Sequence, residues 1–118
     1  MRAFHGWFAY VVIALNLGVG LWGLVWVRRR MSAPRSFLAL VLAGQSAVAV
    51  QVVTGVAYMR QLGQEPGFHS FYGFVILIAA ILSWAFRGED PRRAVTVLSV
   101  VALFIGAVAI RGLSVAGR

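Results

Sequence analysis

The sequence predicts an all-α integral membrane protein, a bundle of four helices that run up and down. Of its 118 residues, 61% are hydrophobic and 12% are charged, which is more apolar surface than a soluble domain of this size can bury. The apolar residues form four long runs, and polar connections rich in arginine separate them. Because short connections make consecutive helices antiparallel neighbours, we predict a single transmembrane domain over residues 1–118.

The first run covers about residues 4–27 and the second about residues 36–58. At ~1.5 Å per residue, each is long enough to cross a ~30 Å hydrocarbon layer. Arg28–Arg30 follows the first run instead of preceding it, which favours a retained helix over a cleaved signal peptide. Asn16 and Gln45 lie near the middle of their runs, so we expect them to bond to each other.

The third run covers about residues 68–86 and the fourth about residues 94–110. In the fourth, Ala102 and Gly106 form a pair of small residues one turn apart, which lets another helix approach closely. In the second apolar run, Gln51 and Gly55 are four residues apart and therefore share a face of the helix. We expect the Gln51 amide to bond across to a neighbouring helix.

The net charge of +8 comes entirely from arginine. The arginines stand at the ends of apolar runs and do not form a polar face, so we expect no nucleic-acid binding. Seven of them follow the first and third runs: Arg28, Arg29, Arg30, Arg35, Arg87, Arg92 and Arg93. The opposite side has four: Arg2, Arg60, Arg111 and Arg118. The positive-inside rule then predicts cytoplasmic turns and external termini, in the plasma membrane of a bacterium.

The only two histidines, His5 and His69, occur in similar surroundings. Each follows a phenylalanine, precedes aromatic residues by two and three positions, and opens an apolar run. The predicted topology puts them at the same outer depth on diagonal helices, so both can approach one planar cofactor. Cysteine is absent, which excludes thiolate sites and covalent c-type haem. We predict that His5 and His69 ligate the iron of one haem b, for electron transfer or storage.

Each histidine alone is also compatible with an ordinary interfacial role, with one ring nitrogen facing water or a headgroup. The predicted surroundings favour the cofactor. Three small residues leave room for a ring: Ala9, Gly55 and Gly73. Three aromatic residues are expected to pack on it: Phe8, Phe71 and Tyr72. Three outer arginines are expected to pair with haem propionates: Arg2, Arg60 and Arg111.

Residues 4–86 resemble one four-helix half of the heme A synthase family. The shared pattern is His5 opening a helix, Gln51-Val-Val-Thr-Gly55 in the next helix, and His69 opening the third. The resemblance implies that His5 and His69 are the axial pair and that Gly55 lies near the ring. The chain has only one such half, lacks an acidic residue before His5, and has Gly6 where that family usually has arginine. We therefore do not expect it to synthesise haem A alone.

A second hypothesis is a non-catalytic accessory or assembly subunit of a larger membrane complex, without a cofactor. A small transporter or channel is less favoured, because the runs lack charged residues that could form a relay. Nothing in the sequence supports catalysis without haem, since the only acids are Glu65, Glu89 and Asp90. Under either main hypothesis, we expect the partners to be lipid and other membrane subunits of a respiratory or redox complex.

Overall fold

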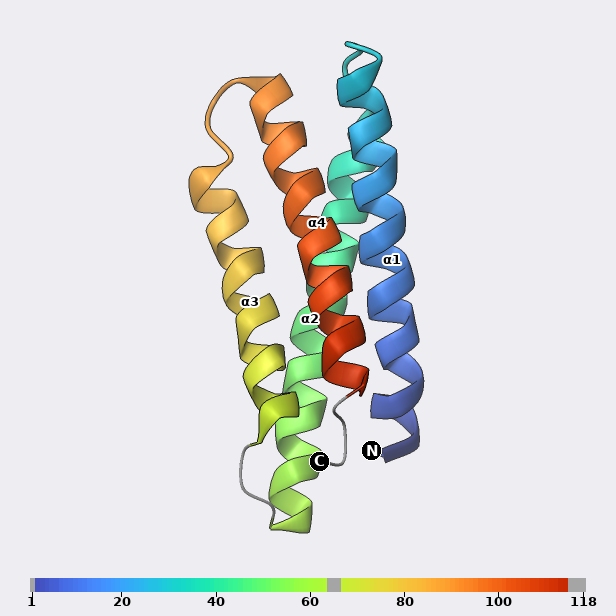
Figure 1. Cartoon of the computed structure of the whole chain (residues 1–118), viewed down its shortest axis with the longest axis vertical. Helices are drawn as coiled ribbons and strands as arrows, with labels where there is room; N and C mark the ends of the chain where they lie inside the picture. Colours follow the sequence, from blue (N-terminus) through green and yellow to red (C-terminus); the bar gives the residue numbers. More distant parts are fainter. Residues whose placement is uncertain (1, 64–66, 115–118) are drawn as a thin grey trace.

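The computed structural model describes residues 2–63 and 67–114, and for Arg2 and Phe68 it describes the backbone alone. Four helices account for nearly all of this part: α1 (Arg2–Arg28), α2 (Arg35–Leu62), α3 (Phe68–Phe86) and α4 (Pro91–Ser114) (Figure 1). They alternate in direction, so α1 begins and α4 ends at the same end of the bundle. Each is long and apolar enough to cross a membrane. The predicted all-α, up-and-down four-helix bundle is confirmed.

Helix α3 has the predicted bounds, whereas the other three helices are longer than predicted. Helix α2 continues to Leu62 and stops at Gly63, whose φ of 65° is in the left-handed region that glycine adopts easily. Helix α4 begins at Pro91, and the carboxylate of Asp90 accepts a hydrogen bond from the Arg92 N–H at 3.2 Å. Capping residues determine these two helix ends. Helix α2 therefore continues past the predicted apolar run, and α4 begins before it.

The helices pack in a ring in which α1 lies between α2 and α4, and α3 also lies between α2 and α4 (Figure 1). Helices α1 and α3 are therefore diagonal, as predicted. The closest packing is between α1 and α4, and the loosest between neighbours is that of α2 with α3. Two side chains at the first turns of α1 and α3 can consequently meet only by reaching across the core.

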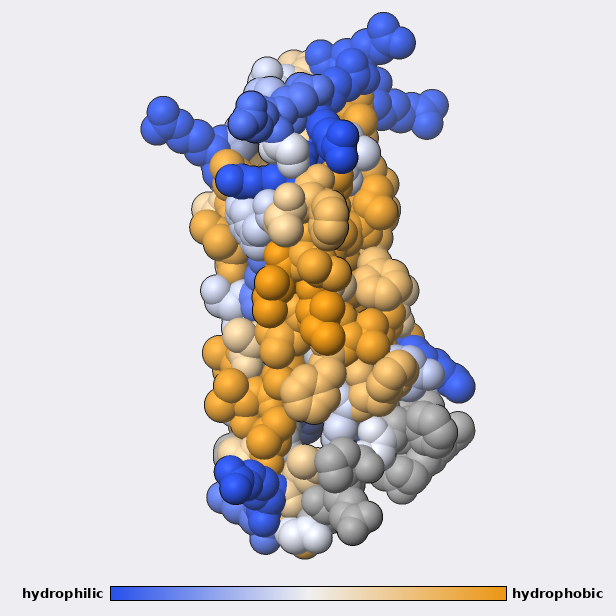
Figure 2. Space-filling model, turned by 90° about the vertical axis from the view of Figure 1, so that its left-hand side faces the viewer, coloured by the Kyte–Doolittle hydropathy of each residue, from blue (hydrophilic) through white to orange (hydrophobic). Residues whose placement is uncertain are grey.

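The buried core contains two clusters of apolar side chains. One includes Val12, Val48, Ile76 and Ile105, and the other consists of Val19, Phe37, Val41 and Leu98. Large apolar side chains also cover the outside, and Trp7, Val53 and Ile81 are 63%, 67% and 63% exposed. Figure 2 shows an apolar band between hydrophilic ends. Such a surface is suited to lipid, and together with the four long apolar helices it indicates a membrane protein.

Glycine makes the close approach of α1 and α4 possible. A Cβ atom on Gly20 would lie 2.9 Å from the Ser99 carbonyl oxygen, and one on Gly106 would lie 2.5 Å from the Leu17 side chain. Ala102 and Gly106 are both buried, so the predicted pair of small residues packs between helices. A Cβ atom on Gly18, by contrast, would meet nothing within 4 Å. Only some glycines of α1 are therefore required by packing.

The predicted bond between Asn16 and Gln45 is wrong. The Asn16 amide donates to the carbonyl oxygens of Val12, at 2.9 Å, and Gly44, at 3.4 Å. Gln45 instead faces α3, where its amide donates to Ser83 Oγ at 3.1 Å and its oxygen accepts from the Trp84 ring N–H. Adjacent residues of a helix point about 100° apart, so Gly44 faces α1 while Gln45 faces another neighbour.

Candidate functional site

The two histidines meet across the core of the bundle. His5, in the first turn of α1, and His69, in the first turn of α3, are both half-buried. Their Nε2 atoms are 3.3 Å apart. The diagonal position of α1 and α3 points these side chains toward each other, and their equal depth follows from the matching starts of the two helices. The juxtaposition predicted from the sequence is therefore present in the structure.

The two imidazole rings meet nitrogen to nitrogen. Their centroids are 5.5 Å apart and their planes are nearly perpendicular, at 84°. The centroid distance exceeds the Nε2–Nε2 distance by 2.2 Å, which is about twice the radius of a five-membered ring, so both Nε2 atoms lie close to the line between the centroids. Two ring nitrogens directed along one line could ligate a single metal ion from opposite sides if the distance between them increased.

The second nitrogen of His69 binds the end of α4. His69 Nδ1 lies 2.8 Å from the carbonyl oxygen of Gly112. Since α4 ends at Ser114, this carbonyl has no donor within its own helix. A carbonyl can only accept, so Nδ1 must carry the proton. In the neutral ring, Nε2 then has the lone pair, which is the form that ligates a metal.

His5 packs on α2 at the pair of residues that the sequence places on one face. The Gln51 amide donates to the His5 carbonyl oxygen at 2.8 Å, so the predicted interhelical bond of Gln51 is confirmed. One turn later, a Cβ atom on Gly55 would lie 2.8 Å from Cε1 of the His5 ring. Any larger residue at position 55 would displace the ring, and glycine is thus required for the position of His5.

A cavity of about 820 Å³ surrounds the histidine pair, within the usual range of small-molecule sites. All four helices line it, and Val12 and Ile76 of the buried core lie among its walls. Small residues contribute much of the lining: Gly6, Ala9, Gly55, Gly67, Gly73, Ala109 and Gly112. The three positions that we expected to leave room for a ring are all among them.

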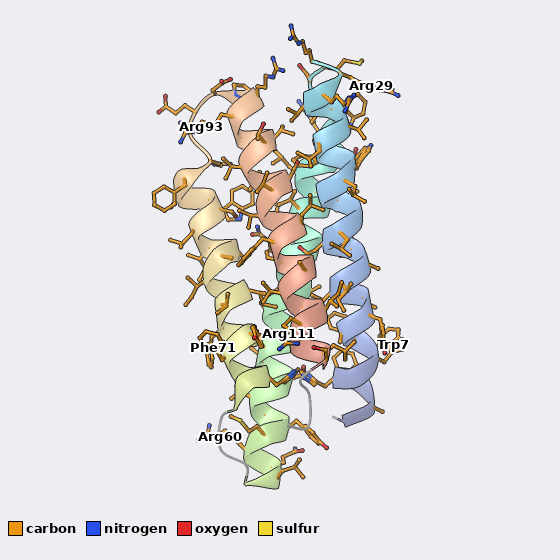
Figure 3. All side chains as sticks on the ribbon, in the orientation of Figure 1. Trp7, Arg29, Arg60, Phe71, Arg93 and Arg111 are labelled. Atoms are coloured by element: carbon orange, nitrogen blue, oxygen red, sulfur yellow. The ribbon has the colours of Figure 1, made fainter. Side chains whose placement is uncertain are left out.

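Two of the expected aromatic contacts are not at the cavity. Tyr72 lines it, but Phe8 packs against the core and Phe71 is 59% exposed. Figure 3 shows Phe71 on the outer side of α3. Phe71 follows His69 by two residues, which rotates it about 200° around the helix axis. The expectation that Phe8 and Phe71 pack on a ring is therefore wrong.

The arginines expected near propionates lie at the correct end but outside the cavity lining. Arg60 and Arg111 are exposed and lie toward the end opposite Arg29 and Arg93 (Figure 3). The Arg2 side chain and Arg118 are outside the described residues. Neither Arg60 nor Arg111 contacts the histidine pair, so any role in binding requires a ligand that extends to the surface.

Gly112 was not predicted as part of the site. Its contribution is a backbone carbonyl, which no side-chain pattern reveals, and the fourth helix was predicted to end before it. Met59 was also missed: it lines the cavity, and its sulfur accepts a hydrogen bond from Ser70 Oγ at 3.6 Å. Its position on the same face as Gly55 is the only sequence signal that could have identified it.

Among the described residues, this place has two histidines as candidate metal ligands. No group of three or more His, Cys, Asp or Glu side chains capable of holding a metal ion occurs in residues 2–63 and 67–114. A structural zinc site needs about four protein ligands. The geometry instead suits a metal whose remaining positions are filled by another molecule, as a porphyrin fills four positions around iron and leaves two axial ones.

Comparisons of the chain with models of known protein families, with curated proteins and with solved structures found no match to any of them.

Proposed function

We propose that this protein is a small b-type cytochrome of the membrane, in which His5 and His69 ligate one haem b. The observation that carries the proposal is the nitrogen-to-nitrogen contact of two imidazoles, 3.3 Å apart, from diagonal helices. The sequence pattern that resembles one half of the heme A synthase family includes the same two histidines and Gly55. The function is electron transfer, either by the protein alone or as a haem-bearing subunit of a redox complex.

A haem between the two histidines would require a longer distance between their Nε2 atoms. Metal–imidazole bonds are ~2 Å long, so two Nε2 atoms on opposite sides of one ion lie ~4 Å apart. The present distance of 3.3 Å must therefore increase by ~0.7 Å. Rotation of both histidine side chains can contribute to this increase. The cavity of about 820 Å³ and its small lining residues provide space beside the pair. When bound, the haem supplies a one-electron redox centre, and two histidine ligands leave no open position for oxygen.

The protein's own contributions are ligation, orientation and charge. The Gly112 carbonyl fixes the His69 tautomer that leaves Nε2 able to ligate. Gly55 admits the His5 ring. Arg60, Arg111 and Arg2 belong to the same end of the bundle, and their guanidinium groups are suited to pair with propionates that extend out of the cavity.

The proposal includes an orientation in the membrane. The arginine-rich turns lie in the cytoplasm and the histidine pair lies near the outer face of a bacterial plasma membrane, as the bias of seven arginines against four supports. The partners are then lipid and other membrane subunits that donate or accept electrons at the outer side.

Cysteine labelling tests this orientation, since the chain contains no cysteine of its own. Single cysteines at Ser32 or Glu89 should react with a membrane-impermeant maleimide only after the cells are opened. A cysteine at Gln61 should react in intact cells. All three positions are exposed, and they avoid Gly63 and Gly88, whose positive φ values disfavour a side chain. The reverse labelling pattern would show that the orientation is inverted.

A visible absorption spectrum tests the cofactor. Protein purified from haem-replete cells, or mixed with haemin after purification, should show a low-spin spectrum with sharp α and β bands on reduction. Zn²⁺ and Cu²⁺ should be tested in parallel, since imidazole also suits these ions. A protein that binds no haem under either condition, or that binds one of these ions in preference, would contradict the proposal.

The alternative, an accessory subunit without cofactor, has one observation in its favour. In the form with His69 protonated at Nδ1, the contact of 3.3 Å is compatible with a hydrogen bond in which the His5 N–H donates to the His69 nitrogen. The pair would then join α1 to α3 with no metal. Under this alternative, the purified protein leaves the spectrum of added haemin unchanged and co-purifies with larger membrane subunits.

A further inference from the structure

Two polar atoms at the cavity are buried and have no hydrogen-bond partner among the described residues. They are Nδ1 of His5 and Oε1 of Gln51. Gln51 is only 9% exposed, and burying such an oxygen without a donor is unfavourable. The two atoms belong to residues already in contact, because the Gln51 amide nitrogen donates to the His5 carbonyl oxygen at 2.8 Å.

Nδ1 of His5 and Oε1 of Gln51 do not form a hydrogen bond with each other in this structure, and the tautomers of the histidines show which of them could donate. His69 donates its Nδ1–H to Gly112, so its Nε2 can only accept from His5. His5 must then carry its proton on Nε2, which leaves its Nδ1 as an acceptor. The Gln51 oxygen is also an acceptor, so neither atom can donate to the other. In this state, both atoms remain unsatisfied.

Ligation of a metal by His5 changes its Nδ1 from an acceptor to a donor. To ligate through Nε2, the neutral His5 ring must carry its proton on Nδ1, and this proton transfer within one ring releases none to solvent. His5 Nδ1–H is then a buried donor, and a histidine that ligates a metal almost always gives this proton to an acceptor. The Gln51 oxygen lies on the amide that already holds the His5 backbone.

We propose that Gln51 is the positioning residue of His5, and that its Oε1 accepts the His5 Nδ1–H when haem is bound. This inference rests on the proposed function. Each of the two axial ligands would then donate its Nδ1–H to a carbonyl oxygen. For His69 this is a backbone carbonyl, and for His5 it is a side-chain carbonyl. Gln51 would thus stabilise the ligating tautomer without touching the metal.

The first test is haem affinity. Titration of purified protein with haemin should show that Gln51→Leu binds ~10–100-fold more weakly than wild type, the usual loss when the acceptor of a ligating histidine is removed. Gln45→Leu is the matched control. It also removes an amide that bonds to another helix, but Gln45 does not line the cavity, so haem affinity should not change.

A second variant separates positioning from support of the fold. Gln51→Glu keeps an oxygen that accepts from His5 Nδ1–H and replaces the amide that donates to the His5 carbonyl. It should bind haem within a few-fold of wild type. The electron paramagnetic resonance spectrum of its oxidised haem should remain that of two ligated imidazoles, whereas that of Gln51→Leu should differ, because the His5 orientation is no longer held.

Three outcomes are distinguishable. Wild-type protein that takes up no haem overturns the proposed function and this inference with it. If wild type and Gln51→Leu bind haem equally well, the proposed function stands and Gln51 has no positioning role. If Gln51→Glu loses haem as strongly as Gln51→Leu, the donated bond to the His5 carbonyl is what matters, and the inference about Oε1 is overturned.

Discussion

His5→Ala and His69→Ala should each abolish the low-spin spectrum of the reconstituted protein. Each substitution removes one of two axial bonds to the same iron, so the remaining haem is either lost or converted to a five-coordinate, high-spin form. The two variants should behave alike, since both nitrogens point at the same place. Absorption spectra of the oxidised and reduced forms, recorded at equal protein concentration, measure the effect.

Added imidazole distinguishes a missing ligand from a misfolded protein. Removal of the His5 ring enlarges a cavity that already has about 820 Å³, so free imidazole can enter and replace the lost ligand. The low-spin spectrum should return in His5→Ala when millimolar imidazole is present. Trp7→Ala serves as the control, because Trp7 lies two residues away and is 63% exposed. A low-spin spectrum that survives in either histidine variant without imidazole would show that the two histidines do not share one iron.

The second large effect concerns the packing of α1 on α4. Gly20→Ala should destabilise the bundle by ~1–3 kcal/mol, the typical result of overpacking. The added methyl group would lie 2.9 Å from a backbone oxygen of Ser99, which cannot move aside as a flexible side chain can. Unfolding of the purified protein in mixed detergent micelles, followed by circular dichroism, measures the change.

Gly18→Ala is the matched control in the same helix. A Cβ atom there meets nothing within 4 Å, and alanine favours a helix over glycine by about 0.5–1 kcal/mol. The control should therefore be neutral or slightly stabilising. Equal effects of the two substitutions would mean that α1 and α4 do not approach as closely as the structure shows.

The sequence predicted the fold because membrane crossing leaves strong signals. Apolar runs of sufficient length and arginine at their ends were enough to place the four helices. The ends of the helices were less accurate, since capping by Gly63 and Asp90 extends α2 and α4 beyond the apolar residues. Pairing of buried amides was not predictable in detail. A rotation of about 100° per residue decides whether Asn16 meets Gln45 or the carbonyl of Gly44.

The candidate site was predictable in part. The repeated surroundings of His5 and His69, together with the diagonal placement of their helices, predicted that the two rings would meet. Gln51 and Gly55 were predicted to share one face of their helix, and the structure shows that His5 packs on this face. The role of Gly112 was not predictable, because a backbone acceptor leaves no trace in residue type. Phe71 was wrongly assigned because its nearness to His69 in sequence outweighed its direction around the helix.

The order in which the chain is made bears on the histidine pair. Of the four helices, the one that carries His5 is made before the one that carries His69, and the Gly112 carbonyl that orients His69 lies in the last turn of α4, which is made after both. The complete arrangement therefore exists only after every helix has been inserted and assembled. A ligand that requires both imidazoles in this geometry would bind the finished bundle and not its precursors.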